Sequence, residues 1–163
     1  MKAKAFAVMA AVAAALAISV GGVAAASQSA TLVIHHQVRG CHAWSLNGGP
    51  FIVHQSLRLA RGGTLTVTNN DLMVQELVKT YGPAVRMQLV KQSHMGNMPM
   101  HMKTQMKMGK AGPYAMAHMG AVLKVTFPQA GTYRFKLMDR GDYYKGIKTI
   151  GPDNKPTLTV IVY

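Results

Sequence analysis

Hydrophobic and polar residues alternate in short runs along most of the chain, a pattern typical of strands that bury one face. Gly, Pro, Asn and Asp residues, which favour turns, separate the runs. The alternation predicts strands over 31–38, 52–59, 64–68, 122–127, 132–138 and 157–163. Trp44 follows the first of them and is expected to anchor the core. About seven short strands separated by turns predict an all-β sandwich.

Turn signals also predict how some strands pair. The two strands on either side of Arg61-Gly62-Gly63 are expected to form a hairpin, and so are the two on either side of 128–131. Residues 73–89 could hold a helical turn, which Pro83 would cut short.

The first 26 residues differ from the rest. Lys2 and Lys4 precede an alanine-rich apolar run that closes with Ala24-Ala25-Ala26, the pattern of a secretory signal peptide with its cleavage site. A transmembrane anchor is the alternative, but no basic stop-transfer flank follows the run. We therefore expect export to the periplasm or the extracellular space, leaving residues 27–163 as one domain.

The charge balance restricts the partners. Without Lys2 and Lys4, the 18 basic residues fall to 16 against 5 acidic ones, a net charge of about +11. Such a protein is drawn to anionic envelope surfaces or to an acidic partner, whereas the aromatic-and-basic motifs of nucleic-acid binding are missing. The few acidic residues and the lack of a nucleophile motif argue against an enzyme.

Residues 94–108 hold six methionines and two histidines in fifteen positions. Gly96 and Pro99 interrupt any helix there, so no continuous apolar stripe survives. Thioether sulfur is a soft donor that suits Cu(I) or Ag(I), and imidazole adds affinity for copper. The candidate ligands in this loop are His94, Met95, Met98, Met100, His101, Met102, Met106 and Met108. A low-complexity insertion without a ligand and a Met-rich peptide-binding surface are the alternatives.

Further soft donors lie outside this loop. Cys41 is the sole cysteine of the chain and is followed directly by His42, while His118 and Met119 stand just before a predicted strand. All four are candidate metal ligands, and convergence of the loops at one end of a sandwich could bring them together. His36, on the inward face of the first strand, is better explained as a hydrogen-bonded core histidine.

Two segments resemble the cupredoxin superfamily. Residues 59–71 are similar to the strand and turn that lead to the first copper histidine, and 127–135 to the strand that leads to the Cys-His-Met loop. The Cys41–Ser45 and Lys145–Gly151 segments are similar to those of a group of small exported cupredoxin-like bacterial proteins. The resemblance implies a Greek-key β-sandwich over most of 31–163.

The blue-copper ligands themselves are missing from their usual places. The segment from Lys136 to Gly146 contains neither Cys nor His, and Gln75 stands where the turn would place the first histidine. We therefore predict a Cu(I) carrier or buffer in copper homeostasis, served by a copper-donor or copper-acceptor protein. The alternatives are a metal-free binding module with a cationic surface, and an atypical electron-transfer protein with a thiolate copper site at Cys41, His42 and His118.

Overall fold

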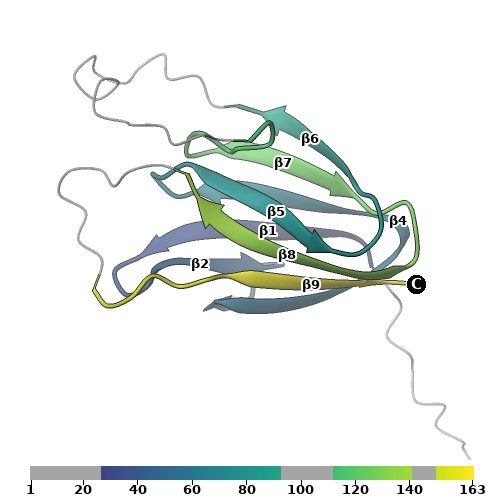
Figure 1. Cartoon of the computed structure of the whole chain (residues 1–163), viewed down its shortest axis with the longest axis horizontal. Coiled ribbons are helices and arrows are strands. Elements are labelled where there is room, and N and C mark those ends of the chain that lie inside the picture. The colour runs from purple at the N-terminus through teal and green to yellow at the C-terminus, as the bar shows by residue number, and fades with distance from the viewer. Residues whose placement is uncertain (1–26, 93–111, 141–149) are drawn as a thin grey trace, which may run out of the picture.

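The computed structural model describes residues 27–92, 112–140 and 150–163 (Figure 1). In chain order the strands are β1 (Ser27–Gln37), β2 (Cys41–Leu46), β3 (Phe51–Ile52), β4 (His54–Asn70), β5 (Gln75–Tyr81), β6 (Arg86–Lys91), β7 (Ala121–Thr126), β8 (Gly131–Asp139) and β9 (Thr157–Val162). Every regular element within these ranges is a strand, so no helix there could span a membrane. The all-β prediction is confirmed.

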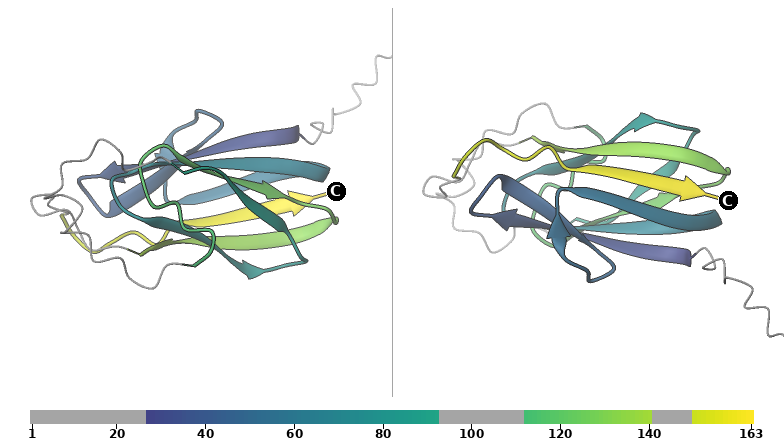
Figure 2. Two further views of the ribbon diagram at one scale, coloured as in Figure 1. Left: turned by 90° about the horizontal axis from the view of Figure 1, so that it is seen from above. Right: turned by 90° about the horizontal axis from the view of Figure 1, so that it is seen from below.

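The strands form two layers, which Figure 2 shows edge-on from above and below. One layer has the order β3-β2-β1-β4-β7-β6, and the other has the order β4-β9-β8-β5. The pairings are mostly antiparallel, but β4 runs parallel to both β1 and β9.

Strand β4 belongs to both layers. Its first half, from His54 to Leu59, pairs with β9, and its second half, from Thr64, pairs with β1 and β7. The start of β1 also pairs with the first half, at Leu59. The chain changes layers between these halves, where Gly62 has a φ of +80° that favours glycine. The first predicted hairpin is therefore wrong, because the Gly-Gly pair bends one long strand instead of reversing it.

The second predicted hairpin is also wrong, although both of its strands exist. Strands β7 and β8 lie in different layers, β7 beside β4 and β6, and β8 beside β5 and β9. The turn at Pro128 thus connects the layers. The helical turn predicted within 73–89 is absent too, because β5 pairs with β8 and the Nζ of Lys79 donates to the carbonyls of Gly82 and Pro83 to close the turn before β6.

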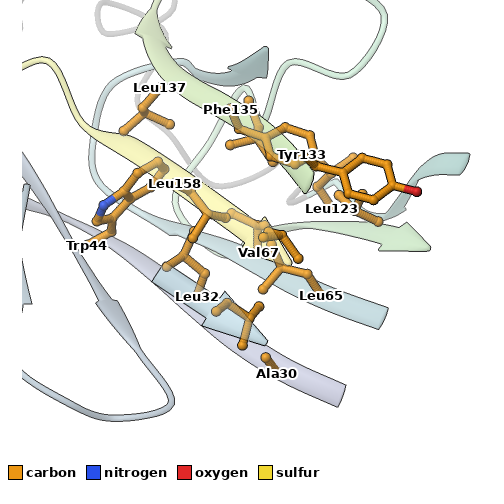
Figure 3. Close-up of a cluster of buried hydrophobic side chains, with 14 of the residues drawn as sticks. Ala30, Leu32, Trp44, Leu65, Val67, Leu123, Tyr133, Phe135, Leu137 and Leu158 are labelled. Carbon is orange, nitrogen blue, oxygen red and sulfur yellow. The ribbon is translucent and has the colours of Figure 1, made fainter. Parts of the chain in front are cut away.

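The core lies between the two layers and is built mostly from residues that alternation placed inward (Figure 3). Val38, predicted to share the inward face of Leu32 and Ile34, is exposed because it follows the end of β1. Leu123 and Val125 of β7 are fully buried, as are Tyr133 of β8 and Val160 of β9. Trp44 is also fully buried, and its Nε1 donates to the carbonyl of Val53 at 3.0 Å. Its predicted role as a core anchor is confirmed.

Candidate metal centre

Three chain segments meet at the end of the sandwich where β1 ends and β9 begins, on the left in Figure 1. His36 stands near the end of β1, Cys41 and His42 open β2, and Met73 lies in the loop between β4 and β5. Antiparallel pairing of β1 with β2 sets His36 opposite His42. The short β1–β2 turn and the register of this pairing therefore bring His36 close to Cys41 and His42.

The β1–β2 turn has an unusual backbone. Gly40 and Cys41 both lie in the left-handed region, with φ values of +71° and +61°. Glycine adopts this conformation freely, but for cysteine it is sterically unfavourable by about 1–2 kcal/mol. A non-glycine residue held in this way commonly marks a functional site. Here the strained residue is the sole thiol of the chain.

Soft and borderline donor atoms converge on this thiol. One ring nitrogen each from His36 and His42 and the Sγ of Cys41 all lie within 4.8 Å of one another. The Sγ is 4.0 Å from the Nδ1 of His36 and 3.7 Å from the Sδ of Met73. Cys41, His42 and Met73 are buried, whereas the side chain of His36 is 19% exposed. The cluster therefore offers a thiol, two imidazoles and a thioether, with one imidazole reaching the surface.

A buried carboxylate orients this cluster. Asp71 is fully buried, and its Oδ2 accepts a hydrogen bond from the Nδ1 of His42 at 2.9 Å. Its Oδ1 accepts from the backbone N–H of Met73 at 3.1 Å and lies 3.7 Å from the Nδ1 of His36. A neutral His42 that donates from Nδ1 carries its lone pair on Nε2, so Asp71 fixes the tautomer as carboxylates do for metal-bound histidines.

Two buried amides complete the surroundings. Asn69 donates to the carbonyls of Met73 and Met116 at 2.9 and 3.0 Å and accepts from the N–H of Asp71 at 2.9 Å. The Nε2 of Gln75 lies 3.2 Å from the Nδ1 of His42 and 3.5 Å from the Oδ2 of Asp71. Because His42 already donates from Nδ1, Asp71 is the acceptor for this amide. Gln75 stands where the resemblance to cupredoxins would place the first copper histidine, and in the structure it lies beside His42.

The other predicted ligands fall into two groups. His94, Met95, Met98, Met100, His101, Met102, Met106 and Met108 lie outside the described residues. His118 and Met119 are described, but the group of converging donors does not include His118, and the side chain of Met119 is exposed. Burial lowers the pKa of His118, and its Nδ1 has no hydrogen-bond partner among the described atoms.

Two residues of the cluster were not on the predicted ligand list. His36 was interpreted as a core histidine, although its place five residues before Cys41 is compatible with a tight turn that would return the chain to it. Met73 carried no signal in the sequence, because its position beside the thiol depends on the course of the β4–β5 loop.

Neither a protein-family model nor a curated protein sequence matches this chain. Three solved structures are similar over most of their length. A cysteine protease inhibitor from Entamoeba histolytica is 10% identical with a TM-score of 0.39, covering 83% of this chain and 96% of its own. Amebosin is 16% identical with a TM-score of 0.31, covering 71% of this chain and 100% of its own. An inclusion body protein from Burkholderia cenocepacia is 8% identical with a TM-score of 0.34, covering 87% and 99%.

Proposed function

We propose that this protein is an exported copper-binding protein of cupredoxin-like Greek-key fold that holds Cu(I) and passes it to a partner. The observation that carries the proposal is the convergence of His36, Cys41 and His42 with the thioether of Met73. The proposal moves the principal site from the Met/His loop to this buried cluster. The loop at 94–108 then supplies additional weak Cu(I) ligands.

The donor set favours copper over zinc. Zinc would take Cys41 and the two histidines but needs a nitrogen, oxygen or thiolate as its fourth ligand. The oxygens of Asp71 already accept hydrogen bonds from His42 and the Met73 backbone. The thioether of Met73 is the remaining donor next to the thiol, and one thiolate, two imidazoles and one thioether form a copper ligand set.

The charge of the site fits monovalent copper. A metal ion at Cys41 displaces the thiol proton, so the thiolate neutralises Cu(I) without any further anion. The exposed edge of His36 is the point at which a partner protein would reach the metal during transfer.

Electron transfer is a second candidate, and the same ligand set is the reason. Two imidazoles and a thiolate with a weak thioether form the blue-copper arrangement, which cycles between Cu(I) and Cu(II). This candidate requires that the copper stay bound in both oxidation states. A carrier instead releases Cu(I) to a competing thiol and holds Cu(II) weakly.

Titration calorimetry with Cu(I), under anaerobic conditions and in two buffers of different ionisation enthalpy, tests the proposal. Binding at Cys41 releases a proton, whereas binding to thioethers releases none. We expect one tight site with proton release in the native protein, its loss in Cys41→Ser, and weaker binding with proton release retained in Met73→Leu. Met87→Leu, a partly buried methionine on β6, is the matched control and should keep the site.

Three outcomes decide between the alternatives. Tight Cu(I) binding that persists in Cys41→Ser would place the metal elsewhere and refute the cluster as the site. A stable Cu(II) form with intense visible absorption would favour electron transfer over delivery. No copper uptake at all would leave the metal-free binding module, with its cationic surface, as the better description.

A further inference from the structure

We propose that Asn154 is a positioning residue for the metal centre, and that the segment from Ile150 to Asn154 holds the β1–β2 turn in its ligand-presenting conformation. This inference deepens the proposed function and rests on it. Asn154 lies 113 residues after Cys41 in sequence and does not belong to the donor cluster. Its contacts nevertheless bracket the thiol-bearing residue on both sides.

The bracket consists of hydrogen bonds to the carbonyls that flank Cys41. The backbone N–H of Asn154 donates to the carbonyl of Gly40 at 2.8 Å. Its side-chain Nδ2 donates to the carbonyl of His42, also at 2.8 Å. One residue thereby fixes the peptide group directly before Cys41 and the one that follows His42.

Ile150 secures the rest of the turn. Its N–H donates to the carbonyl of Val38 at 2.8 Å, and its carbonyl accepts from the N–H of Gly40 at 3.3 Å. A parallel bridge between Arg39 and Ile150 results. The turn is thus tied to the segment before β9 at both of its ends.

Packing against Asn154 also favours glycine at position 40. A Cβ on Gly40 would overlap the side-chain carboxamide of Asn154 and displace it, and the φ of +71° also favours glycine. The left-handed conformation of Cys41 is unfavourable for a free turn. Structures that retain such a residue hold it with surrounding contacts. The N–H of His42 donates to the carbonyl of Gly40 across Cys41 at 2.7 Å, and Asn154 supplies the contacts from outside the turn. Its removal should let the thiol turn away from His36 and Met73.

The variant Asn154→Asp tests this role with little change in volume, because it keeps the backbone bond and replaces the Nδ2 donor with an acceptor. Asn154→Ala removes the side chain altogether. Asn47→Ala is the matched control, since Asn47 accepts a hydrogen bond from the Thr31 N–H at the opposite end of β2. Denaturant unfolding of each variant gives its loss of stability independently of the metal.

Cu(I) affinity is the first measurement. We expect both Asn154 variants to lose about tenfold to hundredfold in affinity, as changes next to metal ligands commonly do. Asn47→Ala should bind copper like the native protein even if it is equally destabilised. Equal affinity in all variants would overturn the positioning role, and so would a loss that follows global stability and appears in Asn47→Ala as well.

Reactivity of the Cys41 thiol is the second measurement, made without metal. Cys41 is fully buried, so an aromatic disulfide reagent should react slowly with the native protein. Loss of the bracket should raise this rate at least about tenfold in the Asn154 variants but not in Asn47→Ala. If the native protein binds no copper, the proposed function fails, yet this rate still decides whether Asn154 positions the thiol. Unchanged rates would refute the bracket.

Discussion

Asn69→Ala is the most demanding test of how the loop beside the cluster is held. Asn69 is fully buried and makes three hydrogen bonds, donating to the carbonyls of Met73 and Met116 and accepting from the N–H of Asp71. Alanine would leave the carbonyl of Met73 and the N–H of Asp71 without this partner, while the carbonyl of Met116 still accepts from the N–H of Gln75 at 3.2 Å. Each buried group that loses its partner costs about 1–3 kcal/mol.

We therefore expect Asn69→Ala to lower the free energy of unfolding by roughly 4 kcal/mol, a large share of the roughly 5–15 kcal/mol typical of a domain. Because Asn69 fixes both Asp71 and Met73, Cu(I) affinity should fall as well. Urea unfolding followed by the fluorescence of the single tryptophan measures the first effect. Asn70→Ala, at the exposed neighbouring position, is the control and should stay within about 0.5 kcal/mol of the native protein.

A loss below about 1 kcal/mol in Asn69→Ala would refute this reasoning, because it would mean that water replaces the amide at no cost. An equal loss in Asn70→Ala would refute it in another way, by showing that the end of β4 is sensitive to any substitution.

Three further predictions follow from the core, from His118 and from the Met/His loop. Trp44→Ala should lower the free energy of unfolding by about 3–5 kcal/mol, since it empties a fully buried site. Urea unfolding followed by circular dichroism measures this loss, and a value under about 1 kcal/mol would contradict the role of Trp44 in the core. The lowered pKa of His118 means that the unfolded chain binds a proton at this residue more readily than the folded chain does, so His118 contributes stability above pH 6.5 that is lost as the pH falls through the folded-state pKa. His118→Gln should therefore reduce the dependence of the free energy of unfolding on pH in this range. An unchanged pH dependence would contradict the prediction. Replacing Met98, Met100, Met102, Met106 and Met108 by Leu should reduce the number of Cu(I) ions bound while the proton-releasing site persists, and an unchanged stoichiometry would show that the loop binds no copper.

The strands β1, β4, β7, β8 and β9 and their inward faces could be predicted from the sequence because alternation depends on local side-chain pattern alone, whereas β2, β5 and β6 were not predicted. Leu123, Val125 and Val160 all face the core as predicted. Pairing partners could not be predicted in this way. Gly62-Gly63 has the composition of a hairpin turn, yet the stretch from His54 to Asn70 finds its hydrogen-bond partners in β1, β7 and β9, which are distant in sequence.

The candidate site was predictable to the extent that its residues are neighbours in sequence. Cys41 and His42 stood out as adjacent soft donors, and the tight turn brings His36 back to them. Met73 and Asp71 reach the cluster through the hydrogen bonds of Asn69, and Asn154 reaches it through the end of the loop before β9. Contacts of this kind depend on the three-dimensional course of loops, for which the sequence carries no periodic signal.

The position of β9 has a consequence for how the sandwich is assembled. β9 is the last described strand in chain order, yet it lies between β4 and β8, and it forms a parallel pair with β4 across about a hundred residues of chain. The layer that contains β8 and β5 therefore cannot join β4 until residues 157–162 have been synthesised. Long-range pairing of this kind slows folding. The hydrogen bonds from Asn154 to Gly40 and His42 likewise join residues more than a hundred positions apart, so the β1–β2 turn is without them until late in synthesis.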